Sequence, residues 1–123
     1  MKKICFITGT RAEYGLLSGL MRRVKESQNL DLKIIATSMH LSKKYGYTYK
    51  EIINDGFSID SKIKMLSNSD KPEDIALSTA EGIKKVSLSL KKIKPDIVVI
   101  LGDRFEALSA ALSSLFLNIP IIH

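Results

Sequence analysis

Short apolar runs alternate with amphipathic segments along this chain. Residues 3–8 are apolar and stop at Gly9, and residues 31–37 (DLKIIAT) are apolar again, so each stretch predicts a β-strand. Between them, from about residue 12 to residue 27, apolar side chains recur at the spacing of a helix. The side chains that this helix is expected to bury are Leu16, Leu17, Leu20, Met21 and Val24.

The middle of the chain is less regular. Residues 49–54 predict a short helix that ends at an Asp-Gly pair, and residues 57–65 alternate as a more exposed third strand does. A polar turn is expected at residues 67–71, and Pro72 then begins a long helix that ends near residue 93. The apolar stripe expected on that helix comprises Ala76, Ala80, Ile83, Val86 or Ser87, Leu90 and Ile93.

The last part of the chain contains the most apolar strand. Residues 97–101 (IVVIL) are apolar without alternation, which is typical of a strand covered on both faces. A helix opens at Gly102-Asp103, and residues 118–123 predict a fifth short strand. The apolar residues of that helix are Phe105, Leu108, Leu112, Leu115 and Phe116.

Strands separated by helices predict βαβ units with right-handed crossovers and therefore a parallel sheet. The expected fold class is α/β: a Rossmann-like parallel sheet of about five strands with helices on both faces. Residues 1–123 are expected to form one domain. The chain stops on an apolar strand, whereas domain boundaries normally fall in polar linkers, so we expect a fragment whose second domain is absent.

Composition places the chain among ordinary globular proteins, with 45% hydrophobic and 26% charged residues. No apolar run approaches the roughly 18 residues that cross a bilayer, so no membrane partner is expected. The lone Cys5 lies in the first strand and has no internal disulfide partner. It predicts a buried, inert thiol and a reducing compartment, hence the cytoplasm.

The net charge of +6 suits an anionic partner such as a nucleotide sugar, a nucleic acid or an acidic lipid surface. The lysines are spread along the chain and do not choose among these. Residues 40–51 interleave Tyr45, Tyr47 and Tyr49 with lysines, a pattern compatible with stacking on single-stranded nucleic acid. We favour the plainer interpretation, a loop followed by an ordinary helix, and expect no nucleic-acid partner.

Ligands of parallel α/β sheets bind beyond the carboxyl ends of the strands, near the point where the strand order reverses. Three segments meet that description here, at residues 9–11, 38–40 and 102–104, and the final strand brings His123 to the same edge. The expected substrate-binding residues are Gly9, Thr10, Arg11, His40, Arg104 and His123.

The first of these segments is not a dinucleotide fingerprint. Arg11 and Tyr14 stand where that fingerprint needs glycine, and the second strand ends without the acid that holds an adenosine ribose. NAD, and any other cofactor, is therefore not expected. Arg11 instead either reaches a phosphate at the helix amino terminus or pairs with a nearby carboxylate such as Glu13, and the pattern supports both.

Asp103 also has two interpretations. With Glu106 three residues later, it predicts a helix N-cap with a capping-box partner. Its position after the central strand equally predicts a catalytic general acid or base facing the cleft. No Cys, His or acidic cluster has the spacing of metal ligands, so no metal is expected, and no serine sits in a G-x-S-x-G elbow.

Taken in order, these segments resemble the hydrolysing UDP-N-acetylglucosamine 2-epimerases of sialic and legionaminic acid pathways. The similar motifs are ITGTRAEYG at 7–15, MHLS at 39–42 with YGYTYKE at 45–51, and GDRFEAL at 102–108. The resemblance covers about the first third of a family member. It implies the amino-terminal half of a glycosyltransferase-B-type fold that binds a UDP-sugar between two domains, in a dimer or tetramer of identical chains.

The resemblance also implies a reaction. A base removes the proton beside the acetamido group, UDP leaves to give a glycal, and water adds to release N-acetylmannosamine. Arg11 matches an arginine near the diphosphate, Asp103 an acid/base or substrate-orienting aspartate, and His40 a histidine near the nucleotide sugar. The other catalytic carboxylates would follow His123, so this fragment alone is expected to be inactive.

One departure affects the substrate. Many relatives have lysine after the glycine of the first motif, whereas Leu16 follows Gly15 here. UDP-N,N'-diacetylbacillosamine therefore stays open beside UDP-N-acetylglucosamine. Two further alternatives are a half-domain of a UDP-sugar glycosyltransferase and a non-catalytic nucleotide-binding module.

Overall fold

The computed structural model describes residues 1–65 and 69–123 and confirms the expected α/β fold. A five-stranded sheet has the order β3-β2-β1-β4-β5, and each pair of neighbours is parallel. The strands are β1 (Lys2–Thr8), β2 (Leu30–Thr37), β3 (Ser61–Ile63), β4 (Ile97–Val99) and β5 (Ile121–Ile122).

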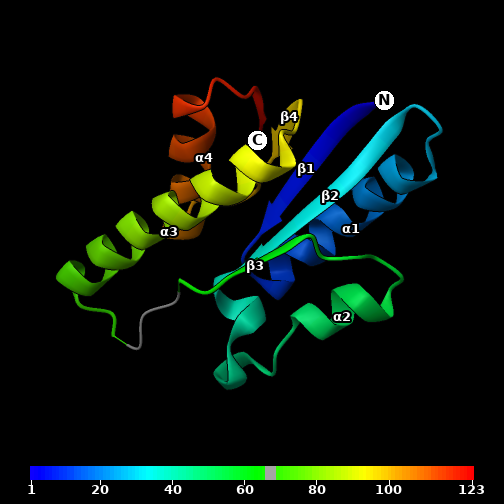
Figure 1. The fold of residues 1–123 in the computed structure, drawn as a ribbon. Helices are drawn as coiled ribbons and strands as arrows, with labels where there is room; N and C mark the ends of the chain where they lie inside the picture. Colours follow the sequence, from blue (N-terminus) through cyan, green and yellow to red (C-terminus); the bar gives the residue numbers. More distant parts are fainter. Residues whose placement is uncertain (66–68) are drawn as a thin grey trace.

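Helices cover both faces of the sheet (Figure 1). One face is covered by α1 and α2, and the other by α3 and α4. Two short 3₁₀ helices, η1 and η2, lie between β2 and α2. The bounds are α1 (Arg11–Glu26), η1 (Ser38–Leu41), η2 (Lys43–Tyr45), α2 (Tyr49–Asn54), α3 (Pro72–Ile93) and α4 (Phe105–Phe116).

The core has two layers because the central strand buries side chains on both sides. Along β1, Ile4 and Phe6 join the cluster under α1, while Cys5 and Ile7 join the cluster under α3 and α4. Burying a large apolar side chain contributes about 1.5–3 kcal/mol. The expected burial of Cys5 is confirmed, and burial raises the pKa of its thiol to about 12, which disfavours the reactive thiolate.

The strand order reverses between β1 and β4. The chain builds outward from β1 through β2 to β3 and then crosses to the other side of β1 for β4. The loops after β1 and β4 therefore lie next to each other at the carboxyl edge, where α/β folds bind ligands. No helix in the described residues is long and apolar enough to cross a bilayer.

The predicted buried face of α1 is partly wrong. Leu17, Met21 and Val24 are buried, but Leu16 is 77% exposed and Leu20 is 49% exposed. Tyr14 is buried in their place. Tyr14, Leu17, Met21 and Val24 form one stripe at helical spacing, and the two exposed leucines lie on the neighbouring stripe that faces away from the sheet.

The third strand is shorter than residues 57–65. Phe57 and Met65 are buried, but only Ser61–Ile63 pairs with β2. The Asp60 carboxylate accepts a hydrogen bond from the Ile34 N–H at 2.8 Å. A side chain therefore takes the place of a backbone carbonyl just before the pairing of β2 with β3 begins. Strands β4 and β5 are likewise shorter than predicted, and the turn expected at residues 67–71 lies partly outside the described residues.

The predicted faces of α3 and α4 are also partly wrong. On α3, Ala76 and Ala80 are exposed, and Gly82 is buried with Val86 and Leu90. On α4, the exposed residues include Leu108, Leu115 and Phe116, while the buried ones are Glu106, Ser109, Ala110, Ser113 and Ser114. Small side chains allow the helices to pack closely, and their hydroxyls find backbone acceptors: Ser109 donates to the Thr79 carbonyl at 3.0 Å and Ser113 to that of Ile83 at 3.2 Å.

Gly82 is expected to be the least tolerant position of this contact. A Cβ at Gly82 would collide with the buried Met65 side chain and would lie 2.8 Å from Ser109 Oγ, so Gly82→Ala should destabilise the chain by about 1–3 kcal/mol. Gly19 lies on the exposed side of α1, and a Cβ at Gly19 would have nothing within 4 Å. Gly19→Ala should therefore stabilise the chain by about 0.5–1 kcal/mol. Urea unfolding followed by circular dichroism measures both, and equal effects would contradict the packing argument.

Candidate functional site

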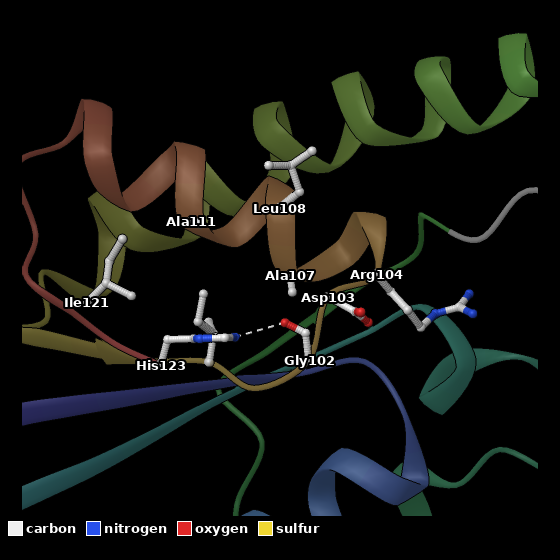
Figure 2. A pocket seen from close by; sticks show the side chains of 9 residues that line it. Gly102, Asp103, Arg104, Ala107, Leu108, Ala111, Ile121 and His123 are labelled. Carbon is white, nitrogen blue, oxygen red and sulfur yellow. Dashed lines mark hydrogen bonds between the residues drawn. The ribbon is translucent and has the colours of Figure 1, made fainter.

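A pocket of about 290 Å³ lies at the carboxyl end of β4. Figure 2 shows its polar side chains, Asp103, Arg104 and His123, beside apolar walls that include Leu108 and Ile121. His123 lies at the carboxyl edge as predicted, and its Nε2 is 2.9 Å from the Gly102 carbonyl, which can accept a hydrogen bond from it. Three of the predicted site residues thus surround one pocket.

The interpretation of Asp103 as a helix cap is wrong. Helix α4 begins at Phe105, its N-cap is Arg104, and no side chain caps it. Gly102 turns the chain with φ +94°, a left-handed conformation, so the backbone needs further residues before it becomes helical. Asp103 is exposed, and its carboxylate makes no hydrogen bond or ion pair within the described part of the chain, which leaves it available at the pocket.

Arg104 is held by Glu106, the residue that was expected to be the capping-box partner of Asp103. Its Nε donates to both oxygens of Glu106, at 2.9 and 3.2 Å. Glu106 is only 3% exposed, so this charge-assisted contact compensates a buried carboxylate. The Arg104 side chain remains 41% exposed at the edge of the pocket.

The loop after β1 is organised by Thr10 and Glu13. Thr10 is the N-cap of α1, and its Oγ1 accepts the Glu13 N–H at 3.1 Å. Glu13 Oε1 in turn accepts the Gly9 N–H at 2.9 Å. Burial, and then the nearby Glu106, raise the pKa of Glu13, while the Gly9 N–H acts in the opposite direction. Sequence reasoning assigned Thr10 to substrate and missed its capping role.

Arg11, the first residue of α1, does pair with a carboxylate, but not with Glu13. Its Nε donates to Glu51 Oε2 of α2 at 3.0 Å, and the Arg11 side chain is 73% exposed. Exposed ion pairs contribute little, so the guanidinium can turn to a stronger anion at small cost. Its place at a helix amino terminus suits phosphate.

Gly9 lies in a tightly packed position. A Cβ at Gly9 would lie 3.1 Å from Thr37 Oγ1 and 3.3 Å from Glu106 Cγ, so the ends of β1 and β2 and the start of α4 meet at this residue. The buried hydroxyls of Thr37 and Ser38 have no hydrogen-bond partner among the described residues. Unpaired buried hydroxyls are uncommon, and these two lie at the end of β2 and the start of the second predicted segment.

His40 lies behind the loops and away from solvent. It is fully buried, with Nε2 3.0 Å from Thr8 Oγ1 and Nδ1 2.9 Å from Thr48 Oγ1. A neutral imidazole satisfies both bonds, and burial lowers the pKa of His40 to about 4. In this structure it ties η1 and the start of α2 to β1, and its contact with substrate stays a prediction.

The structure therefore brings the first and third predicted segments together and sets the second behind them. Glu13 was missed as a linking residue because an acid in the first turn of a helix looks like an ordinary dipole partner. Among the described residues, no three His, Cys, Asp or Glu side chains are grouped to hold a metal ion.

Acidification is expected to destabilise the chain through His40. The pKa of His40 is about 4 when folded, against an ordinary value near 6.5, so protons bind the unfolded state first. Its contribution to stability is complete above about pH 6.5 and is lost towards pH 4, at up to about 1.4 kcal/mol per pH unit. Urea unfolding between pH 7.5 and 4.5 should show this slope, and His40→Gln should reduce it. The exposed His123→Gln variant is the control, and an unchanged slope in His40→Gln would contradict the assignment.

Comparison with known proteins shows which family the chain is similar to. Residues 22–123 match the family described as UDP-N-acetylglucosamine 2-epimerase. A Campylobacter jejuni protein named GDP/UDP-N,N'-diacetylbacillosamine 2-epimerase (hydrolyzing) is 42% identical over 99% of this chain and 32% of its own length. A Legionella pneumophila protein named UDP-N,N'-diacetylbacillosamine 2-epimerase (hydrolyzing) is 37% identical over 100% of this chain and 33% of its own length.

A solved structure has the same fold. The crystal structure of Methanocaldococcus jannaschii UDP-GlcNAc 2-epimerase, in complex with UDP-GlcNAc and UDP, aligns with a TM-score of 0.81 and 29% identity. The alignment covers 98% of this chain and 32% of that one. The chain spans about a third of the length of the curated relatives it matches.

Proposed function

Because this chain belongs to the UDP-N-acetylglucosamine 2-epimerase family, we propose that it supplies the amino-terminal Rossmann-like domain of a hydrolysing UDP-sugar 2-epimerase. The observation that carries the proposal is the adjacency of two loops at the strand-order reversal. One presents Arg11 at the start of α1, and the other presents Asp103 in a pocket. A reaction that breaks a sugar–diphosphate bond and moves a proton on the next carbon needs both groups.

The proposed reaction has two steps. A base takes the proton from C2 of the sugar, the electron pair forms the C1–C2 double bond, and the C1–O bond breaks to release UDP. Water then adds to the glycal, with hydroxide at C1 and a proton on the opposite face of C2. The sum is UDP-sugar plus water giving UDP and the free 2-epimerised sugar.

Arg11 stabilises the departing diphosphate in this scheme. Its guanidinium is exposed, and it stands at the amino terminus of a 16-residue helix whose dipole favours anions. Release from Glu51 costs little in water, whereas a diphosphate offers paired oxygens for a bidentate contact. Gly9 and Thr10 hold the start of the helix in place for this contact.

Asp103 acts on the proton in this scheme. Its carboxylate is exposed beside the pocket and is not engaged in capping α4. Arg104 and His123 border the same pocket, which supports roles in orienting the sugar (Figure 2). The further carboxylates and the nucleotide contacts would come from a second Rossmann-like domain, in a glycosyltransferase-B-type arrangement and an oligomer of identical chains. These 123 residues alone would then be inactive.

Of the two candidate sugars, UDP-N,N'-diacetylbacillosamine is the better supported. The two relatives reported above are named for that sugar. Leu16 stands after Gly15 where many relatives have lysine, which supports a substrate other than that of those relatives. UDP-N-acetylglucosamine remains the second candidate because the family and the aligned crystal structure are named for it. Either reaction would supply a cytoplasmic route to legionaminic or sialic acids.

The full-length protein is expected to release UDP and a free 2-epimerised sugar from UDP-N,N'-diacetylbacillosamine in water, without an acceptor. The same assay with UDP-N-acetylglucosamine decides between the sugars. Phosphate-coupled UDP detection together with NMR of the sugar product measures both. Turnover only in the presence of an acceptor would instead identify a glycosyltransferase.

Two substitutions in the full-length protein separate the proposed roles. Asp103→Asn should lower kcat by about 10²–10⁴-fold while the unfolding midpoint stays within error, because a proton-transferring group is lost and no cap is removed. Arg11→Ala should mainly weaken UDP binding, by about tenfold or more. Arg23→Ala, in the last turn of α1, is the matched control. Retained turnover in Asp103→Asn, or unchanged UDP affinity in Arg11→Ala, would remove that residue from the site.

A further inference from the structure

The two loops at the strand-order reversal share a sequence pattern. Residues 9–13 read GTRAE and residues 102–106 read GDRFE, so each follows Gly-x-Arg-x-Glu. The first follows β1 and the second follows β4, which is its neighbour in the sheet. The same five-residue pattern therefore occurs twice, side by side, where the proposed substrate would bind.

The glutamate of the first loop lies against the glycine of the second. A Cβ at Gly102 would be 2.8 Å from Glu13 Oε2 and 3.5 Å from Glu13 Cδ, so any other residue would displace the Glu13 carboxylate. The other carboxylate oxygen of Glu13 accepts the Gly9 N–H. An ordinary capping-box glutamate bonds the N–H of the N-cap itself, whereas Glu13 reaches past Thr10 and also contacts the other loop.

The glutamate of the second loop lies against the glycine of the first. A Cβ at Gly9 would be 3.3 Å from Glu106 Cγ and 3.4 Å from Glu106 Cβ. Glu106 is buried, and Arg104 of its own loop binds both of its oxygens. We call this reciprocal pair of contacts, Glu13 on Gly102 and Glu106 on Gly9, the glutamate clasp.

The clasp brings two like charges together. Glu106 is one of the causes that raise the pKa of Glu13, so the pair is electrostatically unfavourable by itself. The Gly9 N–H and the Arg104 guanidinium offset that repulsion. Helix capping alone does not explain this arrangement, because each helix could be capped without a contact to the other loop. The close carboxylates and the two glycines therefore indicate a role in holding the two loops together.

We propose that Glu13 and Glu106 are positioning residues that set the Arg11 loop against the Asp103 loop. The catalytic part of this proposal rests on the function proposed above, in which the bonds to be broken lie on adjacent carbons of one sugar. Misplacement of about 1 Å can cost about 10²-fold in rate, so the spacing between the two loops has to be held. The Glu13–Gly102 contact is the better one to test, because Gly9 also touches Thr37.

The first test concerns the contact itself and needs no substrate. Gly102→Ala should increase the unfolding equilibrium constant of the chain strongly, because the added methyl meets Glu13 and φ is +94°. In the double variant Glu13→Ala/Gly102→Ala the added methyl no longer meets the Glu13 side chain. Its unfolding equilibrium constant should therefore be lower, by at least about tenfold, than the value obtained by multiplying the effects of the two single substitutions. Gly46→Ala is the control, since φ is +77° there with nothing within 4 Å, and its effect should simply multiply with that of Glu13→Ala.

The second test concerns catalysis in the full-length protein. Glu13→Ala should lower kcat by about 10–100-fold and change KM less than about threefold. Glu13→Gln keeps the shape and the acceptor for Gly9, so it should restore kcat to within about fivefold and leave the pH profile of kcat unchanged. A proton-transferring carboxylate would not be rescued by glutamine. Glu81→Gln, on the exposed side of α3, is the control and should match the wild type.

The outcomes are distinguishable. Multiplicative effects in the Glu13–Gly102 cycle would overturn the clasp. A coupled cycle together with an unchanged kcat in Glu13→Ala would overturn the positioning role. If the wild-type protein turned over no UDP-sugar, the proposed function and the catalytic part of this inference would both be wrong, while the cycle would still decide whether the clasp exists.

Discussion

Two loops of this chain lie so close together that a Cβ at the first residue of either loop would crowd a glutamate of the other. Gly9 lies against the end of β2 and the first turn of α4, and Gly102 lies against Glu13. This contact occurs between β1 and β4, where the direction of strand addition reverses. The placement of Arg11 and Asp103 relative to each other depends on it, because each belongs to one of the two loops. The pocket after β4 shares this constraint, since Gly102 is one of the residues that line it.

Polar groups buried behind the edge keep the rest of it in place. The imidazole of His40 joins Thr8 of β1 to Thr48 at the start of α2, so three segments share one neutral ring. Glu106 is buried with Arg104 as its partner. Buried polar groups with all their bonds satisfied favour one arrangement over its alternatives, because any shift leaves an atom unpaired. The edge is therefore built on oriented hydrogen bonds, while the apolar clusters on either side of the sheet supply most of its stability.

Local signals sufficed for the elements of the fold but not for their faces. Pro72 is a strong signal for the start of a helix, and the Asp-Gly pair at 55–56 is a strong signal for the end of one. Helices α3 and α2 accordingly have the predicted bounds. The buried faces depended on neighbours that periodicity does not reveal: Tyr14 replaced Leu16, and the serines of α4 replaced its leucines because α3 packs closely there. Asp103 could not be told from a cap without knowing that Gly102 turns the chain first. The role of Glu13 depends on its contact with the other loop, which no local sequence signal predicts.

The hydroxyl contacts between α3 and α4 also limit how this sequence can diverge. Ser109 and Ser113 each face a backbone carbonyl of α3, and Gly82 faces Ser109. Larger residues would separate the helices, so accepted substitutions at residues 109 and 113 are confined to glycine, alanine and serine unless α3 changes at the same time, and residue 82 is confined to glycine while Ser109 is kept. Related chains that keep this helix pairing should therefore show compensating size changes between residue 82 and residue 109, which makes this pair a sensitive marker of shared α3–α4 geometry.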